Sequence, residues 1–197
     1  MALRSIVAIS QLHAMAELAA KAPAGSFVEV GVFNGGSAQV LYQVAEKQKR
    51  ELHLFDTFTG TPFHINGLDY HKIDREFAAE HAPAEISREL PNAFIHMGVY
   101  PKTHPEYLKD VAFVHCDCDQ YESYVAVISH MWPIMVEDGI MIFDDYPYLL
   151  GAKRAVEEYF HSKDLYKCGQ RYFVLKKSKF FPKYSTLTDF EKAYPLV

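Results

Sequence analysis

The chain has 197 residues, enough for one domain with a full hydrophobic core. Hydrophobic residues make up 49% and charged residues 23%, which is an ordinary globular balance, whereas the aromatic share of 14% is high. The formal net charge of -5 argues against a general nucleic-acid binder, because neutralising phosphates requires a basic surface. The partners predicted from composition are therefore small molecules or other proteins.

The N-terminal segment, residues 1–24, is apolar with helical spacing, and we expect a helix over 5–21. His13 and Glu17 interrupt it, so neither a membrane span nor a leader peptide is predicted. Such a helix would cover a sheet edge or a subunit interface, which favours a homo-oligomer. The chain has 3 cysteines, and an odd number without a leader indicates free thiols in the cytoplasm.

Strand and helix patterns then alternate along the chain, which is typical of a doubly wound α/β fold. Near-continuous apolar strands favour a mostly parallel sheet covered on both faces. The last two strands have no helix between them, which predicts an antiparallel hairpin at one edge. Strands are expected at 26–32, 51–58, 92–100, 111–117, 139–145, 164–168 and 171–178, and helices at 36–50, 121–135 and 151–163, with a short helix or turn at 105–111.

Residues 59–91 interrupt this alternation with a polar stretch that is rich in Gly and Pro. The stretch is too long for an ordinary connection, so we interpret it as a lid or substrate insertion with a helix at 74–82. The aromatic tail, residues 179–197, would close the pocket or pack on a neighbouring subunit. The whole chain, 1–197, is predicted to be one domain.

The first strand ends in a glycine turn, "EVGVFNGGS", that begins at Glu29. Its glycines permit a tight turn and close approach of a ligand to the start of the next helix, where Ser37 lies. The spacing matches neither the dinucleotide fingerprint nor a P-loop. Asp56 ends the second strand and is placed to accept both hydroxyls of a ribose. The alternative is that Asp56 merely caps the following turn.

Three carboxylates, Asp117, Asp144 and Asp145, end two strong strands that a single helix connects. Parallel strands end at one sheet edge, so these side chains should converge and repel one another. A hard cation with oxygen ligands would neutralise them, which predicts Mg²⁺. Alternatively an aspartate at a strand end caps the next helix or turn, as Asp119 would if it is not a cofactor contact.

These motifs resemble those of the macrocin O-methyltransferase type of class I S-adenosylmethionine-dependent methyltransferases. The segments "EVGVFNGGS", "LFDTFTGTP", "GVYPKTHPE", "CDCDQYES" and "IMIFDDYPYLLGAKRAVEEYF" carry the resemblance over most of residues 26–160. It implies O-methylation of a small hydroxylated molecule, such as a sugar or aromatic natural product, with Mg²⁺ at Asp117, Asp144 and Asp145. The chain departs from the family pattern in its short N-terminal region and in "DTFTGTP".

The interpretation assigns a role to each predicted site residue. Asp117 is the first candidate for the general base, and His71 in the insertion is the second, ahead of His64. Competing hypotheses are a relative without methyl transfer that acts as a binding or assembly subunit, and a nicotinamide-dependent oxidoreductase, which the glycine spacing disfavours. The residues predicted to bind S-adenosylmethionine are Glu29, Gly31, Ser37, Asp56, Phe58, Gly98, Tyr100 and Asp117, with Val99 and Tyr121 as further contacts.

Overall fold

The computed structural model describes residues 3, 5–72 and 75–177. Strands and helices alternate along the chain as the sequence pattern predicts. The strands are β1 Ser26–Val30, β2 Leu52–Asp56, β3 Ala93–Met97, β4 Val111–Cys116, β5 Met135–Phe143, β6 Tyr166–Cys168 and β7 Arg171–Leu175. The helices are α1 Ile9–Lys21, α2 Gly36–Gln48, α3 Ala82–Glu89, α4 Tyr121–Ile134, α5 Leu150–Tyr159 and the 3₁₀ turn η1 Ser162–Asp164.

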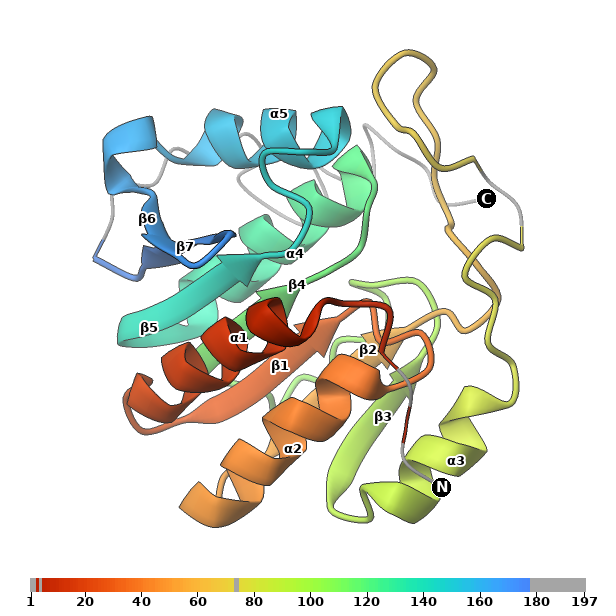
Figure 1. The fold of residues 1–197 in the computed structure, drawn as a ribbon, viewed down its shortest axis with the longest axis vertical. Helices are drawn as coiled ribbons and strands as arrows, with labels where there is room; N and C mark the ends of the chain where they lie inside the picture. Colours follow the sequence, from red (N-terminus) through yellow and green to blue (C-terminus); the bar gives the residue numbers. More distant parts are fainter. Residues whose placement is uncertain (1–2, 4, 73–74, 178–197) are drawn as a thin grey trace.

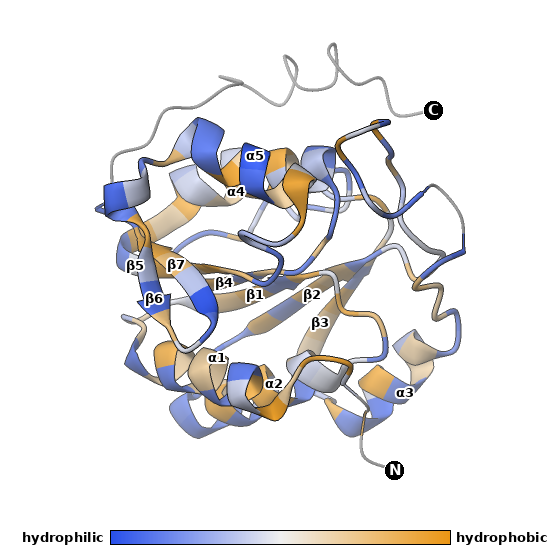
Figure 2. Cartoon of the chain, turned by 45° about the horizontal axis from the view of Figure 1, so that its top comes forward, coloured by the Kyte–Doolittle hydropathy of each residue, from blue (hydrophilic) through white to orange (hydrophobic). Residues whose placement is uncertain are grey.

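The strands form one sheet of 7 strands in the order β3-β2-β1-β4-β5-β7-β6. Strands β1 to β5 pair in parallel, whereas β7 pairs antiparallel with β5 and with β6. Helices α4 and α5 cover one face, and α1, α2 and α3 lie on the other (Figures 1 and 2). The predicted doubly wound sheet with a C-terminal antiparallel hairpin is confirmed.

The core lies in two layers, one on each face of the sheet. Every residue of β4 is buried, because its alternate side chains face the two helix layers. Val114 packs toward the α4 and α5 side and Phe113 toward the α1 and α2 side, both with 0% exposure. Burial of each such side chain contributes about 1.5–3 kcal/mol to folding. This core fixes the strand ends that carry the polar residues.

The insertion differs from the prediction in where its helix lies. The described part of 74–82 forms turns, and the helix instead spans Ala82–Glu89. Pro83 explains the shift, because proline is favoured in the first helical turn and disfavoured farther along. The N-terminal helix likewise begins at Ile9 rather than residue 5. The tail, 179–197, lies outside the described residues. Among the described helices, none has the length and apolarity that crossing a bilayer requires.

Candidate active site

A cavity of about 420 Å³ opens at the carboxyl ends of the parallel strands. Its volume falls within the range of small-molecule sites, roughly 300–1,000 Å³. Its walls come from the turn after β1, the insertion, the loops after β2, β3, β4 and β5, and the segment before α1. Most of the predicted site residues line it, namely Gly31, Ser37, Asp56, His71, Gly98, Val99, Tyr100, Asp117, Asp144 and Asp145. Glu29, Phe58, His64 and Tyr121 do not.

The turn after β1 is packed directly against the loop after β4. Gly31 has φ +92°, and a Cβ there would lie 1.6 Å from the backbone oxygen of Asp117. Gly35, also with positive φ, precedes α2 as its N-cap and leads into the buried Ser37. The backbone N–H groups at the start of α2 therefore lie beside the cavity, where they can donate to an anionic ligand group. Only glycine permits this approach of two backbones.

Asp56 holds the glycine turn through its carboxylate. Its Oδ2 accepts hydrogen bonds from the N–H groups of Val32 at 2.6 Å and Phe33 at 2.8 Å. Its Oδ1 accepts from Phe58 N at 2.6 Å, so three backbone donors converge on one side chain. The turn-capping interpretation of Asp56 is therefore correct. Asp56 also lines the cavity, and its contact with a ribose stays a prediction.

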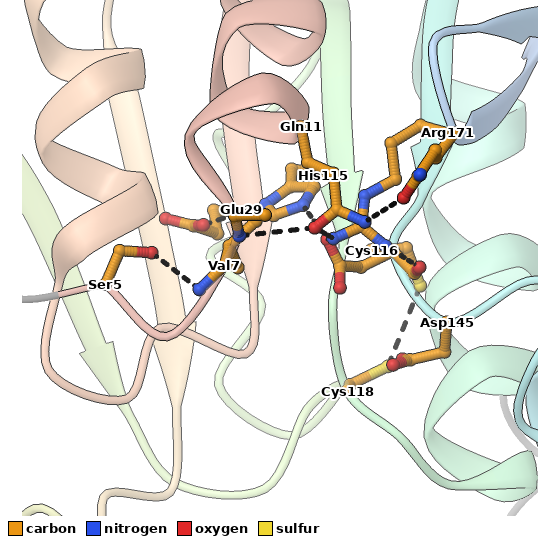
Figure 3. Close-up of polar contacts among 12 residues, drawn as sticks. Ser5, Val7, Gln11, Glu29, His115, Cys116, Cys118, Asp145 and Arg171 are labelled. Carbon is orange, nitrogen blue, oxygen red and sulfur yellow. Dashed lines mark hydrogen bonds and ion pairs between the residues drawn. The ribbon is translucent and has the colours of Figure 1, made fainter.

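Two predicted cofactor residues lie outside the cavity wall. The Glu29 carboxylate is fully buried within the sheet, where its Oε1 lies 2.8 Å from His115 Nδ1 (Figure 3). Glu29 thus supports β4 rather than facing the cavity. Phe58 is 1% exposed and belongs to the core on the α1 and α2 side. The chain turns after β2 with a φ of +55° at Phe58, and the predicted packing of its ring on a cofactor stays a prediction that its burial does not favour.

Tyr121 and His64 are also held away from the cavity. The Tyr121 ring lies in the core, and its hydroxyl donates to Glu158 Oε2 at 2.6 Å. The His64 ring nitrogens face the backbone oxygen of His71 and Asn66 Oδ1, each at 2.9 Å. Neither residue lines this cavity.

Two of the carboxylates after β4 and β5 converge together with a histidine of β4. Ligand atoms of His115, Asp117 and Asp144 lie within 4.8 Å of one another. Oδ2 of Asp145 accepts hydrogen bonds from Tyr124 Oη at 2.9 Å and Asp119 N at 3.1 Å. The metal role of Asp117, Asp144 and Asp145 stays a prediction. His115, which the sequence analysis did not single out, lies two residues before Asp117 and on the same side of the extended chain.

The carboxylate cluster carries more negative charge than its surroundings balance. Burial, followed by repulsion from Asp144, raises the pKa of Asp117 well above its usual range. Burial and repulsion from Asp145 raise the pKa of Asp119 to about 8. For Asp145 itself, burial and repulsion from Asp144 raise the pKa to about 6. Burial is the largest cause of each shift, and repulsion among the carboxylates adds to it.

The chain supplies part of the balancing positive charge. Burial acts to lower the pKa of His115, but hydrogen bonds to Asp144 and Glu29 outweigh it and raise that pKa well above its ordinary value. Arg171 of β7 forms an ion pair with Asp144. The raised pKa values of Asp117, Asp119 and Asp145 remain after both contributions. The oxygen-rich group around Asp117 and Asp144 therefore fits a hard divalent cation.

His71, the predicted second base, lies in the cavity wall between two acids. Its Nε2 is 3.6 Å from Asp119 Oδ1, and its Nδ1 is 3.1 Å from Glu76 Oε2. The side chain is 13% exposed, and it reaches the cavity from the insertion. His71 is therefore close to the carboxylate cluster through Asp119.

The insertion is tied to the start of α4 by residues that the sequence analysis did not single out. Gln120 Oε1 accepts from Phe63 N at 2.8 Å, and Asp69 Oδ1 accepts from Tyr121 N at 2.8 Å. Gly151 of α5 makes room for Asp69, since a Cβ there would lie 2.4 Å from Asp69 Oδ1. The predicted insertion is thus docked over the site. No local sequence signal identifies these pairs, because they join segments about 50 or more residues apart.

The prediction of free thiols is confirmed, because none of the three cysteines forms a disulfide, and all three lie within the described residues. Cys116 and Cys118 flank Asp117, with their sulfur atoms 3.6 Å apart (Figure 3). Burial raises the pKa of the Cys118 thiol well above its ordinary value, so this group stays neutral near pH 7.

The sheet order, the antiparallel last pair of strands and the glycine turn beside a cavity define the class I methyltransferase fold. The chain belongs to the macrocin-O-methyltransferase (TylF) family, whose model matches residues 7–168. The family resemblance inferred from the sequence is thereby confirmed.

Similar proteins support this assignment. A curated relative from Streptomyces olivaceus, 8-demethyl-8-(2,3-dimethoxy-alpha-L-rhamnosyl)-tetracenomycin-C 4'-O-methyltransferase, is 28% identical over 153 residues. The match covers 68% of this chain and 58% of the relative, so the chain spans less than two thirds of that relative's length. The calicheamicin methyltransferase CalS11 superposes with a TM-score of 0.72 at 22% identity, covering 84% of this chain and 77% of the other. The O-methyltransferase NovP has a TM-score of 0.68 at 23% identity, covering 87% and 81%.

Proposed function

We propose that this protein transfers a methyl group from S-adenosylmethionine to a hydroxyl of a small molecule, and that Mg²⁺ assists it. The observation that carries the proposal is the packing of the glycine turn at Gly31 directly against Asp117, beside the carboxylate cluster. A donor seated on the turn would lie next to the acidic groups. Methyl transfer needs this proximity of donor, acceptor and base.

The donor half of the cavity would lie over the turn after β1. The N–H groups at the start of α2 and the Ser37 hydroxyl would receive the methionine carboxylate. Asp56 and the segment 98–100 would contact the ribose and the adenine. Negative charge from Asp117 and its neighbours favours the positive sulfonium. These assignments rest on the lining of the cavity.

The acceptor half would lie over the ends of β4 and β5. Asp117, Asp144 and Asp145 would hold Mg²⁺, which would lower the pKa of a hydroxyl that coordinates it. Asp117 remains the first candidate to receive the hydroxyl proton, because it lines the cavity directly beside the turn at Gly31. His71 is the second candidate, because it lines the same cavity.

The wall toward the acceptor half is apolar at its rim. Ile6 is 72% exposed and Tyr148 is 67% exposed, and both line the cavity. The curated relative is named as an O-methyltransferase of a rhamnosylated tetracenomycin. That name and the apolar rim together favour an acceptor that joins a hydroxylated sugar or ring to an apolar body. An assembly into homo-oligomers stays a prediction.

Calorimetric titration with S-adenosylmethionine and with NAD would separate the proposal from its alternatives. We expect binding of S-adenosylmethionine alone, and methyl transfer to hydroxylated acceptors that excess chelator abolishes. Asp144→Asn should lose turnover while it keeps most of its affinity for the donor. Donor binding without transfer to any acceptor would favour the non-catalytic binding subunit. Full turnover of Asp144→Asn, or of wild type in chelator, would contradict the metal role.

A further inference from the structure

Arg171 connects the carboxylate cluster to the N-terminal helix. It lies at the start of β7, is 5% exposed, and points into the cavity wall between α1 and the end of β5 (Figure 3). Its Nη1 donates to the backbone oxygen of Asp144, and its Nη2 faces Oδ1 of the same residue. One guanidinium thus holds both the backbone and the carboxylate of a predicted metal ligand.

The same guanidinium reaches the N-terminal helix. Nη2 of Arg171 donates to Gln11 Oε1 at 2.9 Å, and that oxygen also accepts from Ala8 N at 3.3 Å. The preceding residues 5–7 form part of the cavity wall. Arg171 therefore joins the wall near the acceptor half to Asp144. A lysine in its place could not make this arrangement, because an ammonium lacks the planar fork of donors.

We propose that Arg171 is an internal counter-ion that competes with a divalent cation for the Asp144 carboxylate. When no cation is bound, Arg171 holds Asp144 in place. The cation must displace the Arg171 guanidinium from the Asp144 carboxylate in order to bind. This inference deepens the proposed function and rests on its metal site. Two positive groups cannot both lie against one carboxylate oxygen without repulsion. Arg171 would thus set the affinity of the site for metal and act as a positioning residue.

Alternatively, Arg171 only stabilises the fold by holding Asp144 in place. The two roles predict opposite changes in Mn²⁺ affinity when Arg171 is replaced. If it competes, Arg171→Gln should bind Mn²⁺ more tightly than wild type, by about tenfold or more, because the competing buried charge is gone. If it only orders Asp144, the same variant should bind Mn²⁺ more weakly. Binding is measured by electron paramagnetic resonance of free Mn²⁺ with the full chain and without substrate, so no activity is needed.

Two further variants make the measurement decisive. Lys177 lies just beyond β7, where its exposed ammonium pairs with Asp138. Lys177→Gln removes this positive charge and should leave Mn²⁺ affinity unchanged. Arg171→Lys keeps the charge with a weaker hold on Asp144 and should bind Mn²⁺ more tightly than wild type but less tightly than Arg171→Gln. If Arg171→Gln does not fold, the Mn²⁺ affinity of Arg171→Lys decides between the two roles. Equal or weaker Mn²⁺ binding by the folded Arg171 variants would overturn the proposal.

Titration of the same proteins with S-adenosylmethionine keeps the two proposals distinguishable. Unchanged donor binding with unchanged Mn²⁺ affinity overturns the role of Arg171 alone. Absence of Mn²⁺ binding in every variant overturns that role and the metal part of the proposed function. Absence of donor binding in wild type overturns the methyl transfer itself.

Discussion

The carboxylate of Asp69, in the insertion, accepts a hydrogen bond from the backbone N–H of Tyr121 at the first residue of α4, over 2.8 Å. The other oxygen of Asp69 accepts from Ile65 N at 2.8 Å. One side chain thus closes the insertion on itself and fastens it to the start of a helix, as an N-terminal cap does. His71 follows two residues later, so this attachment helps to place it in the cavity wall.

The attachment depends on the small size of Gly151. Alanine in a helix is ordinarily more stable than glycine by about 0.5–1 kcal/mol. At this position a Cβ would meet Asp69 Oδ1 at 2.4 Å and Tyr121 N at 3.0 Å, and such overpacking costs about 1–3 kcal/mol. We therefore expect Gly151→Ala to lower the free energy of unfolding and to speed proteolysis within 59–81. Chemical denaturation and limited proteolysis measure both, with Lys153→Ala on the same helix as the control. A more stable variant with an unchanged cleavage rate would show that the insertion is held elsewhere.

Glu122 should make stability depend on pH. It is 5% exposed, and burial and repulsion from Asp69 raise its pKa to about 7, from 4.5. The folded state therefore binds more protons than the unfolded state between these values, so stability falls as pH rises through this window. Glu122→Gln should remove this loss and be more stable than wild type at pH 8, by on the order of 1 kcal/mol.

Thermal denaturation at pH 4 and pH 8 tests this expectation. The stability of Glu122→Gln and of wild type should be similar at pH 4 and diverge at pH 8. Glu106→Gln, which changes an exposed acid, is the matched control and should show no divergence. A Glu122→Gln protein that is less stable at pH 8 would mean that the carboxylate is favourably paired.

The close approach at Gly31 gives a prediction with an internal control. Gly31 and Gly67 both have positive φ, at +92° and +77°. A Cβ at Gly31 would overlap the backbone oxygen of Asp117, whereas nothing lies within 4 Å of one at Gly67. Both alanine variants incur the backbone cost of about 1–2 kcal/mol. Gly31→Ala should lose several kcal/mol more and fail to bind S-adenosylmethionine, as denaturation and calorimetry would show. Equal losses in the two variants would argue against tight packing of the turn.

The two candidate bases can be separated by their kinetics. A general base contributes about 10²–10⁴-fold to the rate. If Asp117 receives the proton, Asp117→Asn should lose at least that much in kcat, and His71→Asn should lose less than about tenfold. The measurement is the pH dependence of kcat for each variant, with an acceptor found by screening hydroxylated compounds for methyl transfer. A larger loss in His71→Asn, together with disappearance of the rising limb of the profile, would assign the role to His71.

The fold was predictable because its information is local. Apolar runs such as 111–117, and helical spacing such as 121–135, fix the element type over a few residues, and their alternation fixes a parallel sheet. The rule that ligands bind at the carboxyl ends of parallel strands predicts Gly31, Asp56 and Asp117 at one site, and all three line the cavity. The helix of the insertion lies at Ala82–Glu89 rather than at 74–82, because Pro83 is favoured only in the first helical turn.

Contacts between distant segments could not be predicted in the same way. Arg171 reaches Asp144 only because β7 lies beside β5, and Asp69 reaches Tyr121 only because the insertion folds back. The inward turn of Phe58 depends on a single left-handed backbone angle. His115 shares the Asp117 face of its strand, but a histidine inside an apolar strand has no distinctive pattern.

The three backbone donors that Asp56 collects have a thermodynamic consequence for any ligand of this cavity. The donors at Val32 and Phe33 hold the loop after β1 in one conformation in the free protein, so the entropy of ordering that loop is lost during folding and not during association. A ligand that sits on it meets a preorganised surface, and its affinity is not reduced by an ordering cost. Weakening the anchor at Asp56 should therefore appear mainly as a less favourable binding entropy.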